Sequence, residues 1–181
     1  MKDYTKQISD YIEEEIQVMK KLDVDEINKA MNILEESRIQ GKTVYICGNG
    51  GSGSTASHFT GDFNKGVSIY YDQKYNFVCL NDNIPTMMAI ANDVSYDEIF
   101  RYPLEGRLND GDILIAISGS GNSENVVRAV QYAKECGNIV IGLTGYSGGR
   151  LRELCDINLH VPLDNMQITE DLHLMIDHLM M

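Results

Sequence analysis

The chain has 181 residues, of which 43% are hydrophobic and 23% are charged, and this composition is that of a globular domain with a buried core. Its net charge of −12 argues against nucleic-acid backbones and anionic membranes as partners. A phosphate ligand would therefore have to be held by local dipoles and hydroxyls against an unfavourable overall field.

The first residues, MKDYTKQISD, are polar, and no long apolar segment follows, so we expect neither a signal peptide nor a membrane span. The four cysteines form no CxxC pair, and Cys47 and Cys79 fall in apolar runs. Buried free thiols are therefore favoured over disulfides, and a reducing cytoplasmic location is expected.

Two helices are predicted before the first strand. Apolar residues recur at helical spacing between residues 3 and 20 (Tyr4, Ile8, Tyr11, Ile12, Ile16 and Met19). A second helix is predicted from Asp25 to Gln40, because Gly41 is a natural helix end. We expect this pair, residues 1–41, to pack on the core or on another subunit.

From residue 42 to residue 181 the pattern alternates between strands and helices. The predicted strands are Val44–Cys47, Asn76–Leu80, Ile113–Ile117, Val140–Thr144 and Ile157–His160. Helices are predicted near 53–63, 85–91, 97–108, 122–136, 149–154 and 166–180. This alternation predicts one α/β domain, residues 1–181, with a parallel sheet covered by helices on both faces. Ligands of such sheets bind beyond the carboxyl ends of the strands.

A glycine-rich turn follows the first predicted strand. Glycines at positions 48, 50, 51 and 53 let an anion approach the backbone N–H groups of a helix start, and Asn49 and Ser52 add side-chain partners. The turn lacks both the GxGxxG spacing and the Gly-Lys-Ser/Thr ending, so an ordinary strand-to-helix turn is the alternative. His58 and Asp62, four residues apart on the following helix, are spaced as a metal-ligand pair.

A second such turn follows the third predicted strand. Ser118, Gly119, Ser120 and Ser123 surround the start of the next helix and offer hydroxyl donors beside its N–H groups. A serine N-cap is the ordinary interpretation of one such turn. Two turns at equivalent strand ends favour a bound anion.

Two further groups of polar residues are candidates for the same site. Asn92 and Asp93 either cap a helix beginning near Tyr96 or face the crevice and hold sugar hydroxyls. The last helix carries Glu170, His173 and His178 within an apolar pattern, where a lone histidine is usually a core residue. Glu170 and His178 lie roughly 12 Å apart along a straight helix, so one ion binds both only if the helix is broken or two subunits contribute.

Together these motifs resemble the sugar-isomerase (SIS) domain, and most closely the bacterial sedoheptulose 7-phosphate isomerases, or phosphoheptose isomerases. The resemblance covers nearly the whole chain, from the two leading helices through Gly48–Ser52 and Ser118–Ser123 to the histidines of the last helix. It implies a flavodoxin-like three-layer sandwich with a five-stranded parallel sheet. It also implies a homotetramer whose active sites are shared between neighbouring chains.

The resemblance also implies roles for individual residues. The sugar phosphate would be bound by Ser118, Gly119, Ser120 and Ser123, with help from Ser52. The sugar chain would be bound by Asn49, Gly50, Gly51, Asn92 and Asp93. A divalent metal, usually zinc, would be bound by His58, Asp62, Glu170 and His178; no organic cofactor is expected. The family usually has glutamate at position 62, as the base, and glutamine at position 170, so Asp62 and Glu170 are departures.

Aldose–ketose isomerisation through an enediol needs a base, an acid and a group that polarises the carbonyl. We expect Asp62 or Glu170 to be the base and His178 its acid–base partner, with a metal allowing both carboxylates to ionise. Zinc suits the donors, although iron, manganese and nickel are alternatives. A non-catalytic relative, of the kind that associates with replication initiators or senses phosphosugars beside DNA-binding domains, is the competing hypothesis, as is an isomerase of another sugar phosphate.

Overall fold

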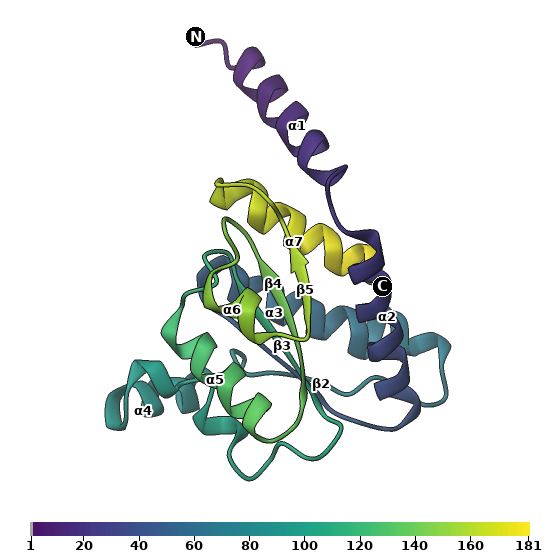
Figure 1. The fold of residues 1–181 in the computed structure, drawn as a ribbon, viewed down its shortest axis with the longest axis vertical. Coiled ribbons are helices and arrows are strands. Elements are labelled where there is room, and N and C mark those ends of the chain that lie inside the picture. The colour runs from purple at the N-terminus through teal and green to yellow at the C-terminus, as the bar shows by residue number, and fades with distance from the viewer. Residues whose placement is uncertain (1) are drawn as a thin grey trace.

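A five-stranded parallel sheet forms the centre of the structure, a computed structural model that describes residues 2–181 (Figure 1). The strand order is β2-β1-β3-β4-β5, with every neighbouring pair parallel. The strands are β1 (Val44–Gly48), β2 (Phe77–Cys79), β3 (Ile113–Ser118), β4 (Ile139–Thr144) and β5 (Ile157–His160). The predicted fold class is confirmed.

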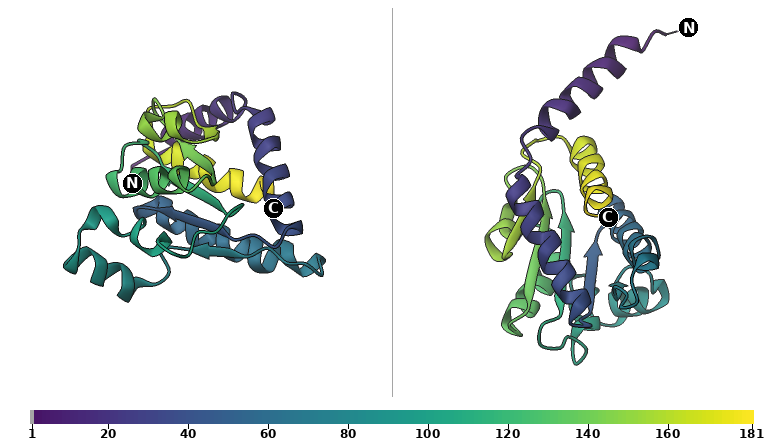
Figure 2. Two further views of the ribbon diagram at one scale, coloured as in Figure 1. Left: turned by 60° about the horizontal axis from the view of Figure 1, so that its bottom comes forward. Right: turned by 90° about the vertical axis from the view of Figure 1, so that its right-hand side faces the viewer.

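Helices cover both faces of this sheet. They are α1 (Thr5–Met19), α2 (Val24–Ile39), α3 (Gly50–Gly61), α4 (Ile84–Asp93), α5 (Glu124–Glu135), α6 (Gly149–Leu154) and α7 (Met166–Met180). In the edge-on view of Figure 2, α3 and α7 lie together on one face and α5 and α6 on the other. A π-helix, Asp62–Val67, continues α3.

Alternation along the strands explains the two layers of core. Ile113, Ile115 and Ile117 of β3 point to the face covered by α2, α3 and α7, whereas Leu114 and Ala116 point to the face covered by α5 and α6. All five of these side chains are at most 2% exposed. Successive side chains of a strand point to opposite faces of the sheet, and here both sets are apolar. The strand is therefore stable only between two layers of helices.

The helix predicted over residues 97–108 is wrong. The segment forms two short 3₁₀-helices, Tyr96–Glu98 and Tyr102–Leu104, although its apolar side chains Ile99, Phe100 and Leu104 are buried in the core. Pro103 has no N–H to donate and disfavours helical geometry at the residue before it. Gly106 then adopts a left-handed backbone angle, φ +68°, which ends any helical continuation.

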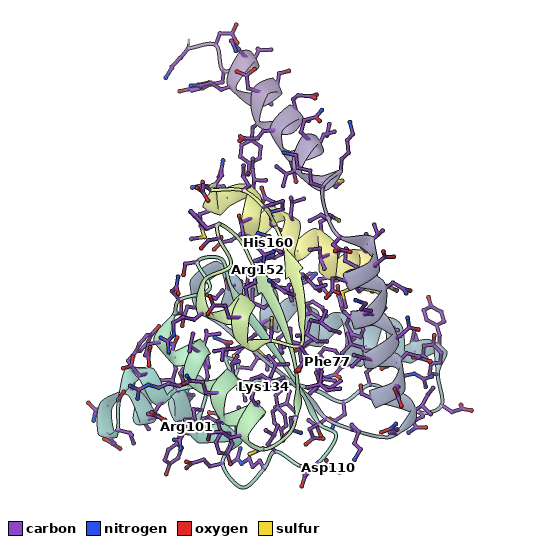
Figure 3. All side chains as sticks on the ribbon, viewed as in Figure 1. Phe77, Arg101, Asp110, Lys134, Arg152 and His160 are labelled. Atoms are coloured by element: carbon purple, nitrogen blue, oxygen red, sulfur yellow. The ribbon has the colours of Figure 1, made fainter. Side chains whose placement is uncertain are left out.

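Helix α1 extends away from the rest of the chain, as Figures 1 and 3 show. Its predicted apolar stripe is exposed, with Ile8 58% and Ile12 50% exposed, and only Val18 of this helix is buried. Of this stripe, Tyr11 is half-buried against the core of its own chain, and the other residues are exposed.

Within residues 2–181, no helix is both long enough and apolar enough to cross a lipid bilayer.

Candidate active site

The two glycine-rich turns meet in one cavity of about 140 Å³ at the carboxyl ends of β1 and β3. Residues from both turns and from the first two turns of α7 line it: Asn49, Ser52, Ile117, Ser118, Gly119, Ser120, Ser123, Met166 and Glu170. Parallel pairing of β1 with β3 brings the starts of α3 and α5 to the same edge of the sheet. Seven of the residues assigned from the sequence thus lie around a single space.

The first turn is fixed by side-chain amides. Asn81 donates to the carbonyl oxygen of Gly48 at 2.7 Å and accepts from its N–H at 3.3 Å, which holds the end of β1 in place. Asn49 and Asn125 exchange amide hydrogen bonds of 2.8 and 2.9 Å. The hydroxyl of Tyr96 also donates to Asn49 Oδ1, at 3.1 Å. Asn49 is therefore oriented before any ligand arrives.

The second turn is closed by its own hydroxyls. The backbone N–H of Gly121 donates to both the carbonyl and the hydroxyl oxygen of Ser118, at 2.9 and 3.2 Å. The hydroxyls of Ser118 and Ser123 lie 3.3 Å apart. Ser123 precedes α5 but caps no N–H of it with its side chain, so its hydroxyl is available to a ligand.

No lysine or arginine lines the cavity, as far as residues 2–181 describe it. The first N–H groups of α3 and α5 have no partners within their helices, and the helix dipoles make both ends positive. An anion bound here would be held by N–H and O–H groups, as the charge of the chain led us to expect.

Glu170 of α7 borders this cavity beside the start of α3. A Cβ atom at Gly51 would lie 2.3 Å from Glu170 Oε2, so the carboxylate packs directly against this glycine and any larger residue would displace it. Glu170 is half-buried. The close contact places one negative side chain at the positive end of α3.

Asn92 and Asp93 form the exposed last turn of α4, where the Asn92 amide donates to Asp93 Oδ1 at 2.7 Å. Neither caps the helical turn that follows, because Ser95 accepts from Asp97 N–H at 2.9 Å and takes that role. The capping interpretation is therefore wrong. Neither residue lines the cavity, and their contact with sugar stays a prediction.

A second cluster, which we name the His/Asp group, comprises His58, Asp62, Asp177 and His178; one ligand atom from each lies within 4.8 Å of the others. The two histidine Nε2 atoms are 3.0 Å apart. Asp62 Oδ2 is 3.3 Å from Nε2 of His58 and 3.8 Å from Nε2 of His178. Both histidines come from the same chain, across α3 and α7.

Asp177 is the unusual member of this group. It has no solvent exposure, and neither carboxylate oxygen has a hydrogen-bond partner. Burial, and then the charge of Asp62, raise the pKa of Asp177 to about 7. Both histidine side chains are about half exposed, so the group opens to solvent on their side.

The donor set fits a divalent cation. Ligand atoms in a tetrahedral zinc site with bonds of about 2.0 Å lie about 3.3 Å apart, and the donor atoms of His58, Asp62 and His178 are separated by 3.0 to 3.8 Å. The carboxylate of Asp177 lies within 4.8 Å of these three atoms. Two carboxylates would balance a 2+ charge, and a cation would satisfy the unpartnered oxygens of Asp177. The structure thus provides a reason for a metal that does not depend on resemblance.

Two findings differ from what residue types alone indicated, and a third agrees with it. Glu170 lies outside the His/Asp group, and α7 is continuous between residues 170 and 178. Asp177 was not anticipated, although it is seven residues after Glu170 and so shares its helix face. His173 is the expected core histidine: its Nε2 contacts the Thr144 carbonyl oxygen at 3.2 Å, and burial lowers its pKa to about 4.

The SIS domain family model matches residues 3–145. The phosphoheptose isomerase of Aliarcobacter butzleri is 37% identical over 154 residues, which cover 84% of this chain and 80% of that protein. The structure of a phosphoheptose isomerase from Francisella tularensis superposes with a TM-score of 0.91 at 31% identity, covering 99% of this chain and 96% of the other. A phosphoheptose isomerase from Neisseria gonorrhoeae gives a TM-score of 0.90 at 28% identity, covering 98% and 96%.

These matches extend over the strands, the two turns and both N-terminal helices, and the identity exceeds 30% over most of both chains. The chain therefore belongs to the SIS domain family and, within it, to the phosphoheptose isomerases.

Proposed function

We propose that this protein interconverts sedoheptulose 7-phosphate and a heptose 7-phosphate. Its family makes it an aldose–ketose isomerase of phosphosugars. The observation that carries the proposal is the cavity shared by the two turns, with Glu170 at its border and the His/Asp group farther along the same two helices. One end suits a phosphate and the other suits the chemistry of a carbonyl.

The phosphate is assigned to the serine-rich turn and to Ser52. Hydroxyls of Ser118, Ser120 and Ser123, together with the N–H groups that open α3 and α5, support this assignment. Asn49, which lines the cavity, is assigned to the sugar chain together with Gly50 and Gly51 of the same turn and with Asn92 and Asp93 from α4. Because the phosphate is held without a cationic side chain, its binding should depend weakly on ionic strength.

His58, Asp62 and His178 would hold a divalent metal, for which zinc is the best fit, and the family pattern adds Glu170. When bound, such a cation polarises a substrate carbonyl or hydroxyl oxygen. Asp62 or Glu170 removes the proton from the carbon next to the carbonyl. His178, half exposed beside Asp62, returns a proton to the neighbouring oxygen.

We further propose that the protein forms a homotetramer in the cytoplasm. The exposed apolar stripe of α1 supports a subunit interface, because this helix leaves the body of its own chain with little apolar contact (Figure 3). Burial of Cys47 and Cys79 as thiols is consistent with a reducing compartment.

The function is tested by incubating the metal-loaded protein with sedoheptulose 7-phosphate in D₂O and following the products by NMR. We expect a heptose 7-phosphate that carries deuterium on the former carbonyl carbon, because that carbon receives the proton when the enediol becomes the aldose. Shorter ketose phosphates measure the preference for chain length. Binding without turnover of any ketose phosphate would instead identify a non-catalytic phosphosugar module.

A matched pair of serine variants tests the phosphate site. Ser120→Ala removes a hydroxyl that lines the cavity, whereas Ser54→Ala removes one from the exposed side of α3. A hydrogen bond to a charged ligand contributes about 1.5–3 kcal/mol, so Ser120→Ala should raise KM roughly 10- to 100-fold. Equal KM values for the two variants would remove the serine-rich turn from the site.

A further inference from the structure

Two acidic residues of α7 lie in different parts of the site. Glu170 and Asp177 are seven residues apart, so they lie on one face of the helix and about 10 Å apart along its axis. Gly51 and His58 are also seven residues apart on α3. Glu170 contacts the first of these and His178 the second, which means that α3 and α7 run side by side in the same direction (Figure 2). One carboxylate is thus held at the cavity and the other two turns away.

Asp177 occupies the position of a ligand. It is fully buried, and both its oxygens lack any hydrogen-bond donor. A carboxylate in that condition is strongly unfavourable unless a cation compensates it. A protonated carboxyl group would still need an acceptor for its own proton, and neither oxygen has a hydrogen-bond partner.

The neighbours of Asp177 supply the remaining donors. Nε2 of His58, Nε2 of His178 and Oδ2 of Asp62 converge with it inside a single chain. Four ligands therefore exist without Glu170 and without a second subunit. No lysine or arginine belongs to this group, so an external cation is the partner that the geometry leaves.

We propose that Asp177, and not Glu170, completes the metal-ligand set with His58, Asp62 and His178, and that Glu170 stays metal-free as the carboxylate that moves the substrate proton. The role given to Glu170 rests on the proposed isomerase function, whereas the assignment of Asp177 as a ligand is independent of it. It divides two tasks that the family pattern assigns to the same residues. Asp62 is then a ligand, and Glu170 is the base.

Four variants of the full chain test this division. Asp177→Asn removes the proposed ligand charge, and Asp177→Leu replaces it with an apolar side chain of similar size. Glu170→Gln removes the proposed base. Asp164→Asn is the charge control, since Asp164 is exposed and outside the His/Asp group.

The readouts are the affinity for ZnCl₂ measured by calorimetry, the visible spectrum of the Co²⁺-loaded protein, and thermal unfolding with and without chelator. Removing a residue that only hydrogen-bonds to a metal ligand weakens metal binding about 10- to 100-fold. Because Asp177 is proposed to be a ligand itself, both Asp177 variants should lose at least that much affinity for zinc. They should also change the Co²⁺ spectrum. Glu170→Gln and Asp164→Asn should keep wild-type affinity and spectrum. In chelator, the Asp177 variants should unfold at or above the wild-type temperature, which shows that they fold.

Activity separates this proposal from the function itself. Glu170→Gln should lose turnover at full metal occupancy. Loss of metal from Glu170→Gln, wild-type affinity in the Asp177 variants, or full turnover by Glu170→Gln would each overturn the division. A wild-type protein that binds zinc in this pattern but isomerises no ketose phosphate would refute the proposed function and leave the ligand assignment standing.

Discussion

Gly121 is the residue at which a single added methyl group should do most damage to the serine-rich turn. Its backbone is left-handed, with φ +67°, and a Cβ atom there would lie 1.8 Å from the carbonyl oxygen of Gly148. Its own carbonyl oxygen accepts from Leu151 N–H at 2.9 Å, which joins the turn to α6. Gly121→Ala must therefore separate two backbone segments.

The magnitude follows from these contacts. A left-handed backbone costs a non-glycine residue about 1–2 kcal/mol. Loss of the hydrogen bond from Leu151 adds about 1 kcal/mol, and the clash with Gly148 cannot be relieved by a side chain because it involves backbone. We expect the free energy of unfolding to fall by at least about 3 kcal/mol, which lowers Tm by roughly 6–12 °C for a chain of this size.

Gly137→Ala is the matched control. Gly137 has a similar backbone angle, φ +79°, but nothing lies within 4 Å of its added Cβ. Only the conformational cost of about 1–2 kcal/mol applies there. Chemical denaturation compares the two free energies, and KM for the substrate reports the turn. If Gly121→Ala costs no more than Gly137→Ala, or leaves KM unchanged, the turn is not held in the way described.

Three further outcomes are expected. In chelator, the raised pKa of Asp177 means that the native state keeps a proton which the unfolded state releases. Asp177 therefore lowers the free energy of unfolding as pH rises from about 4 to about 7, by at most about 4 kcal/mol. His173, whose pKa is lowered, changes stability in the opposite direction over much of this range. The test is therefore the difference in the free energy of unfolding between wild type and Asp177→Asn, measured with urea at pH 4.5 and at pH 8. An equal difference at the two pH values would contradict the prediction. Tyr96→Phe removes a hydroxyl that orients Asn49 and should raise KM several-fold, by about 1 kcal/mol, with little change in Tm, whereas an unchanged KM would show that Asn49 needs no such support. Ile12→Asp should dissociate the oligomer in light-scattering measurements without lowering the stability of the chain, since that side chain is half exposed, and an intact oligomer would move the interface elsewhere.

Local sequence signals predicted most of the fold because their causes are local. Apolar runs of four to six residues bounded by glycine or polar residues identified all five strands, and the parallel pairing followed from the helices between them. The exception, residues 97–108, shows the limit of periodicity. Ile99, Phe100 and Leu104 are spaced as on a helix and are buried as predicted, but Pro103 and the left-handed Gly106 prevent helical hydrogen bonding.

The sequence by itself determined that two glycine-rich turns would end neighbouring strands and that His58 and Asp62 would face the same way, since strand ends and the i, i+4 spacing depend on a few adjacent residues. Tertiary structure alone decided which acidic residue of α7 lies at the cavity and which lies in the His/Asp group. The parallel contact of α3 with α7 places Glu170 against Gly51 and Asp177 beside His58, and that pairing joins residues more than a hundred positions apart. Burial of Asp177 without a hydrogen-bond partner is a property of that contact, because no local pattern states what will surround a side chain.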